Sequence, residues 1–205
     1  MKKVSLCLMG LVCAGVAAAQ QQISVRVCNS VQIPEPALEK AEKEARFVMG
    51  TAGVEVKWLD CSASTMKREL GARDFVLVLA GFRPTNEGGF VKQTMGQTWD
   101  LDRGTKESRL TVYYYAVKEF VGNRGRDEEL SVILGYAVAH EFGHLFMGKQ
   151  HTQDGVMRGV WGSGDLELMK QNCIRFSAVE RGRIQSELLE RDRVWNNPGL
   201  FATTR

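Results

Sequence analysis

Alternating apolar and polar positions mark the first elements of the chain. Residues 23–28 alternate and are rich in β-branched side chains, which predicts a strand. Pro34 and Pro36 then open a helix that buries one stripe of residues at helical spacing, namely Leu38, Ala41, Ala45, Val48 and Met49. The alternation returns over residues 54–59 and predicts a second strand. A strand, a helix and a strand of these lengths form a βαβ unit, whose two strands are parallel.

The rest of the pattern predicts further strands followed by helices. Residues 75–80 are continuously apolar, as in a strand covered on both faces, and residues 110–117 predict another strand. Residues 81–99 are rich in Gly, Thr, Asn and Gln, which favours a loop and a weak edge strand. We expect a polar turn over 123–127, a helix over 128–147, irregular chain to residue 164, and a helix over 177–191 with Val179, Ile184, Leu188 and Leu189 inward. This order predicts one α/β or α+β domain with a mixed sheet.

Composition and charge are those of a globular domain. The chain has 205 residues, of which 44% are hydrophobic and 25% charged, enough for one core and unlike a disordered chain. The formal net charge of +3 falls to about +1 without Lys2 and Lys3, which belong to a segment that we expect to be removed. Neither nucleic acid nor an anionic membrane surface is therefore expected as a partner.

The N-terminal segment, residues 1–19, has the organisation of a secretory signal peptide. Two lysines precede an apolar run over residues 4–18, which is too short to span a bilayer well. Alanines end this run in a cleavage pattern, and we place the cut after Ala19; an uncleaved membrane anchor is the alternative. The prediction is a secreted or periplasmic protein with no membrane association after cleavage. It has one domain over residues 20–195 and a loose tail over residues 196–205.

Three cysteines remain once the signal peptide is removed, namely Cys28, Cys61 and Cys173. In an oxidising compartment, one disulfide and one odd thiol are the simplest count, and three pairings are possible. Both parallel strands of the βαβ unit finish at the same edge of the sheet, and Cys28 and Cys61 each lie at such a finish. Neighbouring strands about 5 Å apart bring them within disulfide reach. We therefore favour the pair Cys28–Cys61, with two buried free thiols as the alternative.

Candidate chemistry is concentrated between His140 and His151, a segment that contains all 3 histidines of the chain. His140 and His144 have i, i+4 spacing on the predicted helix, so both imidazoles lie on one face and can reach one ion. Glu141 is rotated by roughly 100° from His140, so it can lie beside a metal and take a proton from water. Gly148 is suited to end the helix and reverse the chain, which would bring in His151. Three protein ligands leave one position open, as a catalytic zinc site requires.

The segment 140–151, followed by Gly155-Val156-Met157, resembles the metzincin clan of zinc peptidases, which has His-Glu-x-x-His-x-x-Gly-x-x-His and then a methionine turn. The specific likeness covers residues 139–158, and parts of this segment also resemble small secreted bacterial proteins with this signature. The resemblance implies an α+β fold with a mixed, mostly parallel sheet, an antiparallel edge strand, a long active-site helix and a C-terminal helix. It also implies one Zn²⁺ held by His140, His144 and His151, with Glu141 as general base, Met157 as the turn methionine and Gly148 as the helix-ending glycine.

The chain departs from the clan pattern in its spacing. Gly148 and His151 each come one residue late, because the three residues 145–147 replace two. One extra residue adds about 1.5 Å of rise and about 100° of rotation if it is helical. If the extra residue misplaces His151, the substitute candidates for the third ligand are Asp154, Asp165 and Glu167.

Two further roles are open in the same region. No tyrosine follows Met157 directly, so the candidates for a residue that stabilises the oxyanion are Tyr113, Tyr114 and Tyr136, each of which is favoured as a packing residue. Met157 itself would be an ordinary core methionine if His151 were not placed as a ligand.

The sequence as a whole predicts a secreted zinc endopeptidase that acts on peptide or protein substrates. An extended substrate would lie along an edge strand within residues 90–99, a segment that can equally be a surface loop. Two alternatives are an inactive zinc-binding interaction module of the same fold and a structural domain without metal. Retention of Glu141 argues against the first, because a structural site needs no base. The clustered histidines argue against the second.

Overall fold

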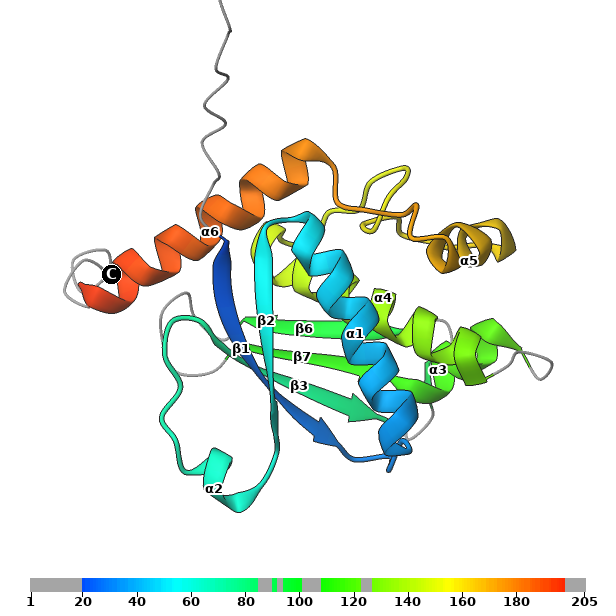
Figure 1. Ribbon diagram of the computed structural model, residues 1–205, viewed down its shortest axis with the longest axis horizontal. Coiled ribbons are helices and arrows are strands. Elements are labelled where there is room, and N and C mark those ends of the chain that lie inside the picture. Colours follow the sequence, from blue (N-terminus) through cyan, green and yellow to red (C-terminus); the bar gives the residue numbers. More distant parts are fainter. Residues whose placement is uncertain (1–19, 85–89, 92–93, 101–107, 123–126, 198–205) are drawn as a thin grey trace, which may run out of the picture.

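The computed structural model describes residues 20–84, 90–91, 94–100, 108–122 and 127–197. The predicted signal peptide, residues 123–126 of the predicted polar turn and the predicted tail from residue 198 onward lie outside the described residues. One main sheet with helices packed against it forms most of the described part of the chain (Figure 1).

The main sheet has the strand order β2-β1-β3-β7-β6. Its members are β1 (Gln21–Asn29), β2 (Val54–Asp60), β3 (Asp74–Ala80), β6 (Gly96–Asp100) and β7 (Ser108–Tyr113). Neighbouring strands are parallel from β2 through β1 and β3 to β7, and β6 runs antiparallel to β7 at one edge. The predicted fold class, with a mixed, mostly parallel sheet and an antiparallel edge strand, is confirmed.

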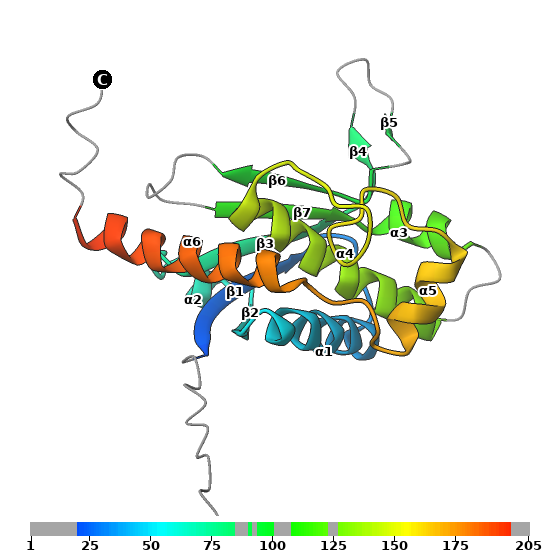
Figure 2. The same ribbon diagram turned by 90° about the horizontal axis from the view of Figure 1, so that it is seen from above.

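A second, two-stranded sheet lies before the edge strand. It pairs β4 (Arg83–Pro84) with β5 (Phe90–Val91) in antiparallel fashion, and Figure 2 shows it projecting from one end of the main sheet. The edge strand predicted within residues 90–99 is β6, which begins at Gly96 and ends at Asp100. Phe90 and Val91 pair with β4 instead.

The predicted βαβ unit is formed by β1, α1 (Glu35–Thr51) and β2. The buried residues of α1 are those of the predicted stripe, namely Leu38, Ala41, Ala45, Val48 and Met49. Val27 of β1 faces Asp60 of β2, so the residues that follow them in register are Cys28 and Cys61. Their Cα atoms are 4.9 Å apart and the two cysteines form a disulfide, the pairing that the parallel strands predict. Among the described cysteines, Cys173 remains as an exposed free thiol.

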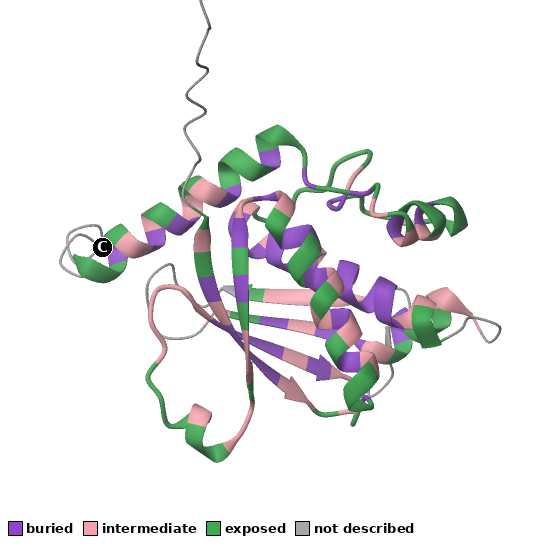
Figure 3. Ribbon diagram, viewed as in Figure 1, coloured by how far each residue is buried: buried purple, intermediate pink, exposed green. Residues whose placement is uncertain are grey.

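Helix α4 (Asp127–Met147) is the central helix of the core and carries the predicted histidine pair. It packs closely on α1 because Gly135 has no side chain; a Cβ there would lie 2.6 Å from the Ala41 carbonyl oxygen. By length and composition alone α4 is apolar enough to cross a membrane, but 78% of its most apolar window is buried inside the protein. Figure 3 shows this helix as largely buried. Its nearly uniform apolar character is therefore that of a core helix.

Helix α3 (Tyr114–Val121) replaces the second half of a predicted strand. The strand predicted over residues 110–117 ends at Tyr113, so the prediction is wrong from Tyr114 onward. The run of tyrosines favours a strand by propensity. Tertiary packing outweighs this preference, because the helix buries Ala116 and Val117 against the core.

Helix α5 (Ser163–Lys170) shortens the irregular segment that was expected to reach residue 164. Its first turn is held by Asp165, whose carboxylate accepts a hydrogen bond of 2.6 Å from the Gly162 N–H. The sequence shows no Ser, Thr, Asp or Asn at this N-cap, so the usual start signal is missing. A shorter helix, α2 (Ala63–Met66), follows the disulfide.

Helix α6 (Ala178–Asn196) confirms the predicted last helix and extends it. Two of its four predicted inward residues are buried, but Val179 and Leu189 are 68% and 59% exposed, so the prediction for them is wrong. The buried stripe instead includes two charged residues. Glu180 closes a capping box at the start of the helix, and the Arg191 guanidinium lies 5.4 Å from the centre of the Phe75 ring. Hydrophobic periodicity does not assign charged residues to a buried face, which explains the error.

Candidate metal centre

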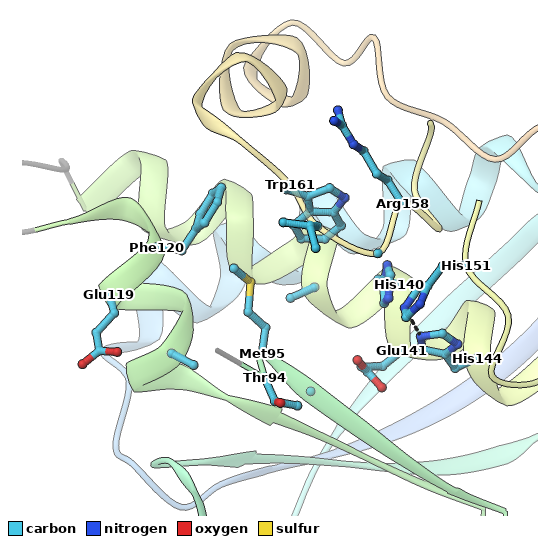
Figure 4. A pocket seen from close by; sticks show the side chains of 15 residues that line it. Thr94, Met95, Glu119, Phe120, His140, Glu141, His144, His151, Arg158 and Trp161 are labelled. Carbon is cyan, nitrogen blue, oxygen red and sulfur yellow. Dashed lines mark hydrogen bonds between the residues drawn. The ribbon is translucent and has the colours of Figure 1, made fainter. Parts of the chain in front are cut away.

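Three histidines converge at the C-terminal end of α4. His140 and His144 lie on one face of the helix with their ring centroids 4.6 Å apart, and His151 comes from the following loop. The His151 ring is 5.3 Å from that of His140 and 4.7 Å from that of His144. One ligand atom from each residue lies within 4.8 Å of the others, a grouping that can hold a metal ion. Figure 4 shows the three rings side by side, with Glu141 next to them.

The turn at Gly148 brings His151 to this group in spite of the longer spacing. Helix α4 continues through Met147, and Gly148 adopts a left-handed conformation with φ of 83°, which favours glycine. Its N–H donates to the His144 carbonyl oxygen at 2.9 Å, which closes the last turn of the helix. The additional residue is thus taken up as helix, and the chain reverses after it.

Backbone carbonyls fix the orientation of two of the imidazoles. His140 Nδ1 lies 2.7 Å from the Val156 carbonyl oxygen, and His144 Nδ1 lies 2.9 Å from that of Gly148. A carbonyl only accepts, so Nδ1 carries the proton in both rings and Nε2 is left free as a ligand. His144 Nε2 points at His151 Nε2 across 3.1 Å. This donor set fits a zinc ion, which prefers neutral imidazole nitrogens and binds three of them in catalytic sites.

Burial keeps two of these imidazoles neutral. Burial lowers the pKa of His140 to about 4, opposed by its hydrogen bond to the Val156 carbonyl and assisted by the neighbouring imidazoles of His144 and His151. Burial also lowers the pKa of His144. A neutral ring is the form that binds a metal, so little proton release accompanies binding at these two residues near neutral pH.

The rotation of α4 is set by aromatic residues on its opposite face. The Phe142 and Phe146 rings pack edge-on against Phe75 of β3, with centroid distances of 5.7 Å and 5.6 Å. These contacts turn Phe142 toward the sheet and leave His140 and His144 toward the loop that carries His151. The same core packing therefore orients the candidate ligands.

Glu141 is buried beside the histidines and faces the edge strand. Its carboxylate Oε2 accepts a hydrogen bond of 2.9 Å from the Thr98 hydroxyl, which also lies 3.1 Å from the Glu141 carbonyl oxygen. Gly96 leaves room for the carboxylate, because a Cβ at this position would lie 2.4 Å from Oε1. Burial raises the pKa of Glu141 to about 7, and the hydrogen bond from Thr98 opposes this rise. The sequence pattern did not single out Gly96 or Thr98, since their contact with Glu141 crosses from the sheet to α4.

The loop after His151, residues 152–157, folds back beneath the three histidines. Thr152 N–H donates to the Met157 carbonyl oxygen at 2.9 Å, which closes the loop on itself. Met157 is fully buried, and the position of its sulfur is set by Gly143, where a Cβ would lie 2.1 Å from Sδ. The Trp161 ring meets the His140 ring edge-on at 5.4 Å. Met157 is thus placed beneath the turn of α4 that separates His140 from His144.

The close approach of Met157 to Gly143 predicts that a larger residue at position 143 destabilises the protein. Gly143→Ala is expected to lower the free energy of unfolding by about 1–2 kcal/mol, because overpacking costs about 1–3 kcal/mol and alanine regains up to about 1 kcal/mol of helix propensity. Gly182→Ala in α6 is the matched control. A Cβ there has no neighbour within 4 Å, so this variant is expected to gain stability. Urea unfolding of the metal-free proteins measures both; an unchanged or raised stability of Gly143→Ala would contradict the contact.

The other ligand candidates are engaged elsewhere or stand apart from the group. The Asp165 carboxylate pairs with Arg158 at 2.9 Å besides capping α5, and Glu167 pairs with Lys170 at 3.0 Å. Among the described residues, neither they nor Asp154 share a metal-sized grouping with the histidines.

The tyrosine candidates make packing and hydrogen-bond contacts. The fully buried Tyr136 hydroxyl donates to the Ile174 carbonyl oxygen at 3.2 Å, and the Tyr113 hydroxyl donates to Gln97 Oε1 at 3.4 Å. The Tyr114 ring packs against that of Tyr115. These contacts support the packing interpretation of all three residues.

A cavity of about 710 Å³ extends from the histidines along α4 toward α3. Near the histidines it is lined by polar groups, including Glu141 and Arg158. Its apolar wall is formed by Met95, Ala116, Phe120, Ala137 and Val160, together with Trp161, which lies against His140. Figure 4 shows Glu119, another lining residue, pointing away from the histidines. A cavity of this size and lining can accept a large apolar side chain next to the three histidines.

Comparisons with known proteins give no family assignment. No family model and no curated protein matches the chain. Among solved structures, the chain is similar to archaemetzincin from Methanopyrus kandleri, with a TM-score of 0.46 and 18% identity, over 84% of this chain and 98% of that chain. It is also similar to metalloproteinase-II from Bacteroides fragilis, with a TM-score of 0.41 and 12% identity, over 79% of this chain and 56% of that chain. The chemistry of this protein therefore rests on its own residues.

Proposed function

We propose that this protein is a zinc-dependent endopeptidase. The observation that carries the proposal is the convergence of three histidine nitrogens within 4.8 Å of one another, with the buried Glu141 carboxylate adjacent to them and a substrate-sized cavity alongside. His140, His144 and His151 would hold one Zn²⁺. Three protein ligands leave a coordination position for water or substrate, which is the arrangement of catalytic zinc.

Glu141 is the proposed proton carrier. Bound zinc would supply Lewis acidity, which lowers the pKa of water to about 7 and polarises a carbonyl group. Glu141 takes a proton from the water that attacks the scissile carbonyl carbon, and then delivers it to the leaving amine nitrogen as the C–N bond breaks. Its contact with Thr98 holds one carboxylate oxygen in place during this transfer.

The edge strand and the cavity together fit an extended peptide. Strand β6 is the last strand of the main sheet, so one of its edges can pair with an added strand through main-chain hydrogen bonds. We propose that the substrate lies along Gly96–Asp100, with an apolar side chain in the cavity next to α3.

We further propose that the protein works outside the reducing cytosol. The Cys28–Cys61 disulfide supports this location, because such bonds persist in secreted and periplasmic proteins. The predicted signal peptide is consistent with it.

A catalytically inactive zinc-binding module is the competing function. The burial of Glu141 argues against it, because removing a carboxylate from water costs stability and a non-catalytic zinc site needs no base there. A purely structural zinc site would gain nothing from this group.

The experiment that tests the proposal uses residues 20–205 and a Glu141→Ala variant. Bound metal is measured by elemental analysis, and cleavage is measured with a mixed peptide library. We expect zinc near one equivalent in both proteins and cleavage by the parent alone. Zinc in both without cleavage in either would favour the inactive module, and no metal in either after refolding with zinc would refute the metal centre.

A further inference from the structure

We propose that edge strand β6 positions the general base, Glu141. Thr98 is the positioning residue, and the missing side chain of Gly96 leaves room for the carboxylate. This inference rests on the proposed peptidase function for its kinetic consequences. The geometry that carries it is independent of any bound ion, since it involves only contacts between β6 and α4.

Thr98 and Gly96 lie on the same face of the edge strand. In the register of β6 with β7, Thr98 faces Leu110 and Gly96 faces Val112. Leu110 and Val112 are fully buried in the core, so the paired positions on β6 are turned toward α4 as well. Residues two apart on a strand share a face, and the Glu141 side chain enters between these two positions.

The two residues act on different parts of the Glu141 side chain. The Thr98 hydroxyl donates to Oε2 at 2.9 Å. At Gly96 a Cβ would lie 2.4 Å from Oε1 and 2.5 Å from Cγ, so any larger residue would displace the carboxylate. Thr98 thus holds Oε2, so we assign proton exchange with the reacting water to Oε1.

This arrangement ties the base to the substrate-binding strand. The proposed substrate pairs with the outer edge of β6, and the base is held by a side chain of the same strand. The position of the scissile bond relative to the carboxylate is then set by one short segment, Gly96–Thr98. Such positioning affects the rate of the chemical step more than it affects substrate binding.

The kinetic test compares Thr98→Val, which is nearly isosteric but has no hydroxyl, with Thr98→Ser, which keeps the hydroxyl. For the zinc-loaded full domain, Thr98→Val is expected to lower kcat by about 10- to 100-fold, as misplacement by about 1 Å does, with little change in KM. Zinc content should stay at the parent value. Thr98→Ser is expected to restore most of the kcat. Thr111→Val, a threonine on β7 paired with Gln97, is the matched control and should behave like the parent.

A second test uses no activity. Thermal unfolding of the metal-free proteins is measured for Thr98→Val, Glu141→Ala and the double variant. We expect the loss of Tm caused by Thr98→Val to be smaller in the Glu141→Ala background, because the carboxylate contact is already absent there. Additive changes in Tm would show that the hydroxyl and the carboxylate do not interact.

The outcomes separate this inference from the proposed function. If the parent cleaves peptides and Thr98→Val matches it, or Thr98→Ser is as slow as Thr98→Val, the positioning role is overturned. If the parent itself does not cleave, the peptidase proposal fails, and the stability measurements alone decide whether Thr98 holds Glu141.

Discussion

Glu141→Gln is expected to lower kcat for peptide hydrolysis by about 10²- to 10⁴-fold, the range that a positioned acid–base group contributes. Glutamine keeps the shape of the side chain and can still accept the hydrogen bond from Thr98, but it cannot take a proton from water. Bound zinc should remain near one equivalent, because Glu141 is not among the grouped ligand atoms. Steady-state kinetics on one peptide from the library, with elemental analysis of the same sample, measure both quantities.

Glu119→Gln is the matched control for this substitution. Glu119 lines the same cavity, but its carboxylate points away from the histidines (Figure 4). We expect this variant to retain the kcat of the parent. An equal loss of kcat in both variants would mean that a carboxylate in the cavity matters through its charge alone, and the role of Glu141 as base would be withdrawn.

His151→Ala is expected to weaken zinc binding by well over about 100-fold. Loss of an outer hydrogen bond to a ligand already weakens metal binding by roughly 10- to 100-fold, and this variant loses a ligand itself. The variant keeps two imidazoles, fewer than zinc sites in proteins use. His151 is exposed, so its removal should leave the thermal stability of the metal-free protein nearly unchanged. Competition with a chromophoric chelator measures the affinity, and a thermal scan without metal measures the fold.

Asp154→Asn is the control for ligand identity. Asp154 lies in the same loop and its side chain is exposed, while its backbone carbonyl oxygen accepts a hydrogen bond of 2.7 Å from the Thr152 hydroxyl. We expect this variant to bind zinc as the parent does. Weak binding by Asp154→Asn together with normal binding by His151→Ala would reverse the assignment of the third ligand.

Elements that are determined by residues near one another in sequence could be predicted from the sequence alone. The stripe of α1 has helical spacing, and i, i+4 spacing alone places His140 and His144 on one face. The disulfide follows from one further step, since two parallel strands joined by a helix end at the same edge.

Predictions failed where packing outweighed local preference. Tyr114 has a high strand propensity but begins α3, which covers the core with Ala116 and Val117. In α6 the buried stripe contains Glu180 and Arg191, which a hydrophobic pattern reads as exposed. The core contacts of α3 and the position of Arg191 over the Phe75 ring involve partners that are distant in sequence.

The sequence by itself determined the mixed α+β fold, the long histidine-bearing helix and the set of candidate ligands, because spacing along the chain carries that information. Only the tertiary structure decided how the centre is completed. His151 reaches the group through the left-handed turn at Gly148. Thr98 meets Glu141 across 43 residues of sequence, between a strand and a helix. Such a contact depends on the register of β6 and on the rotation of α4, and both are set by packing of the core rather than by local spacing.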